Sequence, residues 1–265
     1  MAKLNIPVGV SDFAELRSNG YYYVDKSGLI REMLTSSAAK VTLITRPRRF
    51  GKTLGMSMLE NFFNIRKNSE KLFENLEISG NRELCDQWMN QWPVIFFSLK
   101  DIDGLDFQSA YDRLVVQLSN LCKMHVYLLQ SEAIDPDDKK VFLELKAGTA
   151  SEAQVGFSLN TLMRMMESYY RKPVILLLDE YDVPLAKASS NGYYKEMLSV
   201  IKGMMSTSTA EIRKFDPEIP IVALTAHAFD TDQLAALEAG CNEYLLKPID
   251  KTKLMAVLRK YCHKP

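Results

Sequence analysis

The chain has 265 residues, of which 47% are hydrophobic and 25% charged, with 33 basic and 33 acidic side chains and a formal net charge of zero. This length suits one large α/β domain or two smaller ones, and the composition is ordinary for a soluble globular protein. A balanced charge gives no bulk attraction to nucleic acid or to an anionic membrane, so neither partner is predicted. Apolar runs are too short for a transmembrane helix or a secretory signal, and neither is expected.

The four cysteines, Cys85, Cys122, Cys241 and Cys262, are scattered along the chain. They form no C-x-x-C pair, and no histidine lies at metal-binding spacing from them. We therefore expect small buried thiols in a reducing environment, which favours a cytoplasmic location.

Short apolar runs alternate with longer segments of helical periodicity. This alternation predicts an α/β fold with a mostly parallel sheet and helices on both faces. The expected strands, in chain order, are Val41–Thr45, Val94–Leu99, Val174–Leu178, Ile219–Leu224 and Glu243–Leu246.

Helices are expected between these strands, at 54–63, 107–128, 194–205, 230–240 and 254–261. His125 lies on the apolar stripe of the second helix, where a core histidine is the favoured interpretation. The polar, acidic stretch 131–148 is predicted to be a connection or a surface helical hairpin. The sequence changes character at 206–210, which we take as the boundary between two units, 1–207 and 208–265.

Residues 41–54, VTLITRPRRFGKTL, predict a strand that runs into a phosphate-binding loop and a helix. Gly51, Lys52 and Thr53 match the end of the pattern G-x-x-x-x-G-K-[ST], while Arg46 replaces its first glycine. Backbone amides and the helix dipole would bind the phosphates, with Lys52 reaching the β- and γ-phosphates and Thr53 ligating Mg²⁺. The predicted nucleotide-binding residues are Arg48, Arg49, Phe50, Gly51, Lys52, Thr53 and Leu54.

A second motif, VILLLDE at 174–180, is an apolar strand that ends in two carboxylates. Asp179 is placed to hold Mg²⁺ through water, and Glu180 to orient or deprotonate an attacking water. Because both motifs occur in the right order and both at strand ends, the sequence predicts ATP and Mg²⁺ as ligands, with Lys52 and Glu180 as the catalytic residues.

The segments IPVGVSDFAELRSNGYYYVDKSGLI, TRPRRFGKTL and LLLDEYDVPL together resemble the AAA-ATPase-like proteins of bacteria and archaea. The resemblance covers about residues 5–205 and implies a P-loop NTPase fold with Lys52, Thr53, Asp179 and Glu180 in the roles above. In that family an arginine at the position of Arg46 is normal. Members often carry a restriction-like nuclease domain further on, but no nuclease pattern occurs in the last 60 residues, and nuclease activity is not predicted.

The tail, with IPIVALTAHAF followed by GCNEYLLKPID, resembles the C-terminal half of a response-regulator receiver domain, over about residues 210–262. The resemblance implies that Thr225 and Lys247 would contact an acyl phosphate. The tail lacks the acidic pair and the acceptor aspartate of a receiver, so it is not predicted to be phosphorylated. Its flavodoxin-like βα units would complete the sheet of the P-loop half, with Thr225 standing where a sensor residue reads the γ-phosphate, or it is a truncated relic.

Two functions follow as hypotheses. The first is an ATP-binding P-loop protein with weak, Mg²⁺-dependent ATPase activity. Hydrolysis is the further step, because it usually needs an arginine finger, often from a neighbouring subunit, and Arg48 and Arg49 are candidates by proximity alone. The alternative is a non-catalytic pseudo-receiver that binds a protein partner. An engineered or accidental chimera is the third interpretation.

Overall fold

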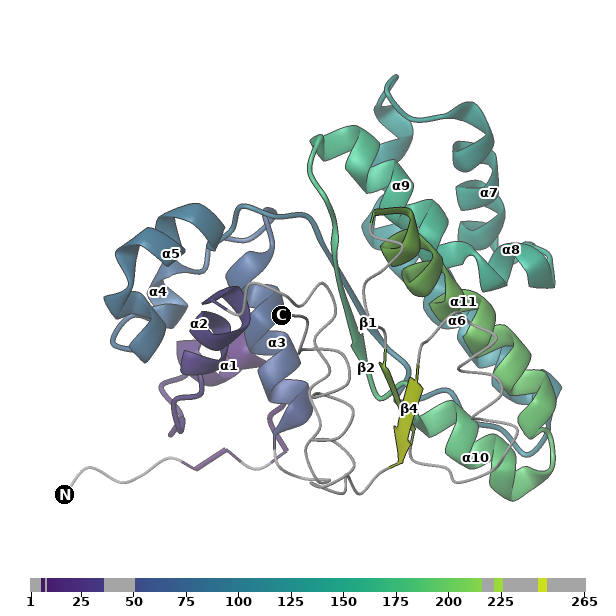
Figure 1. The fold of residues 1–265 in the computed structure, drawn as a ribbon, viewed down its shortest axis with the longest axis horizontal. Helices are drawn as coiled ribbons and strands as arrows, with labels where there is room; N and C mark the ends of the chain where they lie inside the picture. Colours follow the sequence, from purple (N-terminus) through teal and green to yellow (C-terminus); the bar gives the residue numbers. More distant parts are fainter. Residues whose placement is uncertain (1–5, 8, 36–50, 216–221, 226–242, 247–265) are drawn as a thin grey trace, which may run out of the picture.

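The computed structural model describes residues 6, 7, 9–35, 51–215, 222–225 and 243–246 (Figure 1). Several features predicted from the sequence lie outside this part. They are the strand 41–45, the helices at 230–240 and 254–261, and the residues Arg46, Arg48, Arg49, Phe50 and Lys247. The α-helices are α1 Phe13–Ser18, α2 Gly28–Thr35, α3 Lys52–Phe63, α4 Glu70–Phe73, α5 Arg82–Trp88, α6 Phe107–Met124, α7 Pro136–Ala147, α8 Glu152–Gly156, α9 Ser158–Tyr170, α10 Val183–Asn191 and α11 Tyr194–Phe215. There are also two 3₁₀ helices in the described part, η1 Glu77–Gly80 between α4 and α5 and η2 Val126–Gln130 between α6 and α7.

The described strands form two parallel pairs, as expected for an α/β fold. Strand β1 (Val94–Ser98) pairs with β2 (Ile175–Asp179), with Ser98 level with Asp179 at their carboxyl ends. Strand β3 (Val222–Thr225) pairs with β4 (Glu243–Leu246), with Thr225 level with Leu246. The four strands predicted from apolar runs in these regions are therefore confirmed to within a few residues.

Helices cover both faces of the β1–β2 pair, because successive side chains of a strand point to opposite faces. Val94 and Leu177 belong to one core with α1, α2 and α3, whereas Ile95 and Phe97 belong to a second core with α6, α9 and α11. Figure 1 shows α3 on one side of the two strands and α6 and α11 on the other. The sheet thus carries helix α3, and with it the end of the phosphate-loop motif, on one face.

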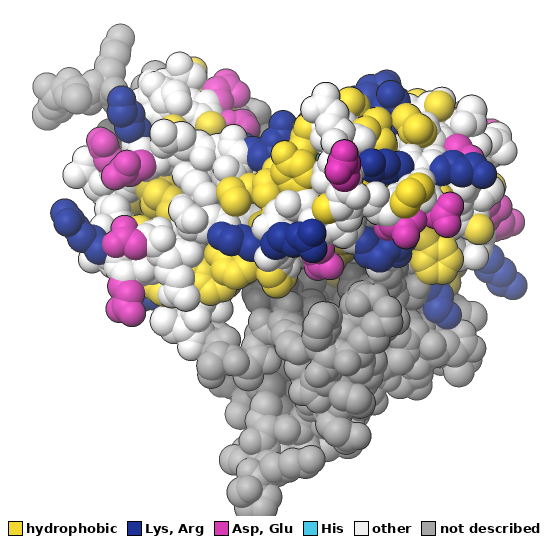
Figure 2. Space-filling model, turned by 90° about the horizontal axis from the view of Figure 1, so that it is seen from above, with side chains coloured by type: hydrophobic (Ala, Val, Ile, Leu, Met, Phe, Trp, Pro, Cys, Tyr) yellow, Lys and Arg dark blue, Asp and Glu magenta, His cyan; other side chains and the backbone are white. Residues whose placement is uncertain are grey.

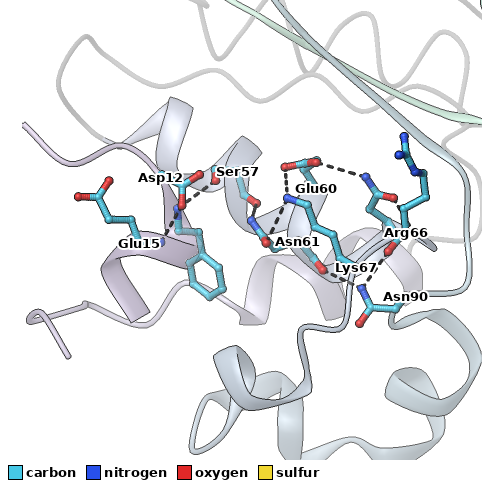
Figure 3. A network of polar contacts seen from close by, with 10 residues as sticks. Asp12, Glu15, Ser57, Glu60, Asn61, Arg66, Lys67 and Asn90 are labelled. Atoms are coloured by element: carbon cyan, nitrogen blue, oxygen red, sulfur yellow. Dashed lines mark hydrogen bonds and ion pairs between the residues drawn. The ribbon is translucent and has the colours of Figure 1, made fainter. Parts of the chain in front are cut away.

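Helix α3 is fastened at its C-terminal half by a network of polar side chains (Figure 3). The backbone N–H of Phe13 donates to the Ser57 hydroxyl at 3.0 Å, which ties α1 to α3. The Asn90 side chain donates to the carbonyls of Asn61 at 3.1 Å and Asn64 at 3.0 Å, so it satisfies carbonyl groups at the end of the helix. These contacts fix the axis of α3 and therefore the position of its N-terminus.

Three helical segments differ from the sequence-based expectation. The helix expected over 107–128 ends at Met124, because His125 closes it and the 3₁₀ helix η2 follows. The stretch 131–148 contains one helix, α7, which begins at the cap Asp135 and ends at Gly148 in the left-handed region. Helix α11 runs unbroken to Phe215 and so crosses the segment 206–210 that was taken as a boundary.

The surface carries charges of both signs. Figure 2 shows basic and acidic side chains interspersed on the face that it draws, with apolar patches between them. Among the described helices, none is long and apolar enough to cross a membrane.

Candidate nucleotide-binding site

The structure brings the two sequence motifs together. The Nζ atom of Lys52, the first residue of α3, lies 3.4 Å from Oε2 of Glu180, which follows β2. Both side chains are about one quarter exposed, so the ion pair is reachable from solvent. Residues that are far apart in the chain therefore share one place, at the N-terminus of α3 and the carboxyl end of β2.

The start of α3 has the local structure that a phosphate-binding helix requires. Gly51 is its N-cap and adopts φ 74° and ψ 31°, a left-handed conformation that favours glycine, and within the described part of the chain no side chain donates a capping interaction there. The N–H groups of the first turn, together with the helix dipole, form a position that can bind an anion. Thr53 and Leu54 lie in this first turn, next to Lys52.

Asp179 is the most unusual side chain of the site, because it is only 1% exposed and neither of its carboxylate oxygens has a hydrogen-bond partner in the described part of the chain. Burying a carboxylate without a partner is costly. Its place is fixed by the sheet, since the Leu99 N–H donates to the Asp179 carbonyl at 2.9 Å. A carboxylate held in this way is a ready ligand for a cation.

Glu180 leaves the strand in a strained conformation. Its φ is +55°, in the left-handed region that residues other than glycine adopt at a cost of about 1–3 kcal/mol. Its carbonyl accepts a hydrogen bond of 3.0 Å from Val183 at the start of α10, which holds the turn. This conformation turns the chain out of the strand at Glu180, whose carboxylate reaches Lys52, while Asp179 stays buried.

The residues present fit a magnesium ion that arrives with a nucleotide. Mg²⁺ in such sites is held by one or two protein oxygens, by phosphates and by water. Asp179 supplies a buried carboxylate that has no hydrogen-bond partner in the described ranges, and Thr53, which follows Lys52 in the sequence, supplies a hydroxyl group. Among the described residues, no group of three or more histidine, cysteine or acidic side chains is placed to hold a metal by itself.

Lys26 lies next to the site, although it is not among the nucleotide-binding residues predicted from the sequence. A Cβ atom built on Gly51 would lie 3.2 Å from the Lys26 Nζ atom, so this ammonium group lies close to the backbone of Gly51. Its segment, 21–26, has no regular secondary structure. The only signal in the sequence was a basic residue within the family-like stretch YYYVDKSG.

His125 and the two described cysteines, Cys85 and Cys122, are not part of this site. His125 is 6% exposed, and its Nδ1 atom lies 3.3 Å from the Tyr127 hydroxyl, in agreement with the core role expected for it. Cys85 and Cys122 are both free thiols. Burial raises the pKa of Cys122 to about 12, which makes it an unreactive apolar group at neutral pH.

In the tail, Thr225 is the last residue of β3 and lies level with Leu246 of β4. Lys247, which follows β4 directly, lies outside the described residues. The parallel register places Thr225 and Leu246, the residue before Lys247, at the same end of adjacent strands.

Comparison with known sequences agrees with both resemblances. The family described as "Predicted AAA-ATPase" matches residues 7–226, and the response regulator receiver domain matches residues 197–259. The protein therefore belongs to the predicted AAA-ATPase family and carries a receiver-like segment at its C-terminal end. The two matches overlap over 197–226, which includes most of α11 and all of β3.

The relatives found are uncharacterised or match the tail alone. An "Uncharacterized protein in vnfD 5'region" of Azotobacter chroococcum mcd 1 is 26% identical over 186 residues, which is 70% of this chain and 30% of the relative. The sensor histidine kinase GacS of Pseudomonas protegens is 42% identical over 59 residues, which is 20% of this chain and 6% of the kinase. The chain thus spans less than a third of either relative's length. No solved structure matches it significantly.

Proposed function

We propose that the protein binds ATP with Mg²⁺ between the N-terminus of α3 and the carboxyl end of β2, and that it hydrolyses ATP slowly. The observation that carries this proposal is the Lys52–Glu180 ion pair next in the chain to Asp179, which is buried and has no hydrogen-bond partner among the described residues. Membership of the predicted AAA-ATPase family supports the same ligand. Lys52 and the first-turn N–H groups would bind the phosphates, and Thr53 and Asp179 would hold Mg²⁺.

Glu180 has two roles in this proposal. Without nucleotide it pairs with Lys52. When the phosphates take over Lys52, the freed carboxylate would orient or deprotonate the attacking water. Bound Mg²⁺ would neutralise charge on the phosphates. Fast turnover would need an arginine finger from a second copy or a protein partner.

The test is binding of a fluorescent ATP analogue in the presence of Mg²⁺. Lys52→Ala should abolish saturable binding, whereas Lys140→Ala, the same change at an exposed position of α7, should leave binding unchanged. Thermal melting of each variant shows whether it is folded. Glu180→Gln should keep binding and lose most of the phosphate release. Equal binding by Lys52→Ala and the unmodified protein would refute the proposal.

The tail supports a second candidate, a pseudo-receiver surface for a protein partner. The receiver match and the shared strand end of Thr225 and Leu246 favour it. In this proposal the receiver-like tail forms a cytoplasmic interaction unit that is joined to the ATP-binding unit through helix α11. Incubation with acetyl phosphate followed by intact-mass measurement should show no phosphate addition, and a stable phosphorylated form would contradict the missing acceptor. Thr225→Ala should leave nucleotide binding unchanged if the tail acts separately.

A further inference from the structure

Positively charged groups from two separate parts of the chain lie near the N-terminus of α3. Lys52 begins the helix, and the ammonium group of Lys26 lies against Gly51, the residue before it. The helix dipole adds a partial positive charge at the same place. An anionic group at this N-terminus would be attracted by both ammonium groups and by the dipole. The Glu180 carboxylate is one anionic group near this N-terminus, at 3.4 Å from the Lys52 Nζ atom.

The backbone on either side of Lys26 is tied down. The Asp25 carboxylate accepts hydrogen bonds from the N–H groups of Ser27 at 2.8 Å and Glu77 at 2.7 Å. Partial burial acts to raise the pKa of Asp25, but these N–H groups outweigh it and lower that pKa, so the carboxylate stays ionised. The Ser27 hydroxyl, fully buried, accepts from the Ile78 N–H at 3.1 Å.

A second tie joins the same segment to α3. The Tyr23 hydroxyl lies 3.2 Å from the Met58 sulfur and accepts a hydrogen bond of 3.4 Å from the Lys26 N–H. The Tyr23 ring also packs edge-on against Phe13, with 5.4 Å between ring centroids. The Lys26 side chain is therefore exposed, while the residues around it are fixed to η1 through Asp25 and Ser27 and to α3 through Tyr23. Such support is typical of a residue that must be held in position for a ligand.

We infer that Lys26 is a second phosphate-binding lysine, which contacts the polyphosphate of the nucleotide together with Lys52. This inference rests on the proposed function and adds a residue from outside the phosphate-loop motif. Glycine is favoured at position 51 by its left-handed conformation, and a side chain there would also require the Lys26 ammonium group to shift slightly.

The experiment is a titration with the fluorescent ATP analogue and Mg²⁺, on the full chain and its variants at several salt concentrations. Loss of a charge-assisted contact should weaken binding about tenfold in Lys26→Ala and in Lys26→Gln. Lys26→Arg should retain most of the affinity. Because one phosphate contact is gone, binding by the alanine and glutamine variants should also depend less steeply on salt.

Three outcomes separate this inference from the proposed function. If Lys52→Ala loses binding and Lys26→Ala binds with unchanged affinity and salt dependence, Lys26 is not a phosphate ligand although the nucleotide site stands. If a folded, unmodified protein binds no nucleotide, both ideas are wrong. If the weakened Lys26→Ala variant also melts far below the exposed control Lys140→Ala and Lys26→Gln binds normally, the role of Lys26 is structural and the inference fails.

Discussion

At the scale of single residues, the proposed site brings charges of both signs together. Lys52 is paired with Glu180, Lys26 lies beside Gly51, and Asp179 is buried without a hydrogen-bond partner in the described part. In the proposed function, this arrangement would sacrifice stability for nucleotide binding, as functional sites often do. Its two carboxylates differ in role because one is buried and the other is turned outward by a strained backbone.

Removing the charge of Asp179 should stabilise the nucleotide-free protein. Asp179→Asn exchanges a buried carboxylate, which has no hydrogen-bond partner among the residues that the structure describes, for a neutral group. We expect the free energy of unfolding to rise by about 1–3 kcal/mol. Asp86→Asn, the same change at an exposed position of α5, should alter it by less than about 0.5 kcal/mol. The measurement is urea denaturation in EDTA. Destabilisation by Asp179→Asn would show that the carboxylate has a partner and is not a vacant cation ligand.

His125 should make stability depend on pH. Burial, with a smaller contribution from the nearby Arg66 charge, lowers the pKa of His125 to about 4. The unfolded chain, with a histidine pKa of about 6.5, then binds the proton more readily than the folded protein. The stabilising contribution is complete above pH 6.5 and is lost as the pH falls to 4, which amounts to about 3 kcal/mol.

The test compares unfolding free energies of the unmodified protein and His125→Gln from pH 4 to pH 7. Subtracting the unfolding free energy of His125→Gln from that of the unmodified protein cancels the effect of carboxylates that titrate in both proteins. This difference in unfolding free energy should increase in favour of the unmodified protein as the pH rises from 4 to 7. A constant difference would mean that the folded protein accepts a proton on His125 without penalty.

At the scale of helices, two glycines should respond oppositely to the same substitution. Gly55 lies in α3 with no described atom within 4 Å of an added Cβ, so Gly55→Ala should stabilise the protein by about 0.5–1 kcal/mol. Gly203 lies in α11, where an added Cβ would approach the Cα of Gly156 in α8 to 3.3 Å. Gly203→Ala must therefore push two helices apart, and we expect a net loss of about 1 kcal/mol. Equal gains in urea denaturation would contradict this close helix crossing.

The elements themselves were largely predictable from the sequence. Apolar runs located β1 and β2, and helical periodicity located α3 and α6. The end of α6 was missed because His125 keeps the apolar spacing while the backbone changes to a 3₁₀ helix. The continuation of α11 to Phe215 differs from the expected end near residue 205, because the change of sequence character at 206–210 indicates a boundary although these residues can also form a helix.

The candidate site was predictable only where a motif carried it. Lys52 and Asp179 stand at the ends of recognisable elements, and parallel packing brings such ends together. The left-handed backbone of Glu180 and the approach of Lys26 to Gly51 depend on contacts between distant segments. No local pattern encodes those contacts, so neither the backbone conformation of Glu180 nor the approach of Lys26 to Gly51 could be predicted from the sequence.

At the scale of the whole molecule, two families share one stretch of chain. The predicted AAA-ATPase match reaches residue 226, beyond the 205 expected from its motifs, and the receiver match begins at 197. Helix α11 and strand β3 thus fit both, which is physically reasonable because both families build parallel sheets from similar strand and helix units. A division at 207 would cut through α11.

The most direct test of this account is the melting temperature of the full chain with and without Mg²⁺ and ATP. A ligand at one hundred times its dissociation constant stabilises the folded state by about 2.7 kcal/mol, so melting should rise by several degrees. The rise should vanish in Lys52→Ala, which should itself melt close to the unmodified protein. An unchanged melting temperature at millimolar Mg²⁺ and ATP, or an equal rise in both proteins, would contradict a nucleotide site at the start of α3.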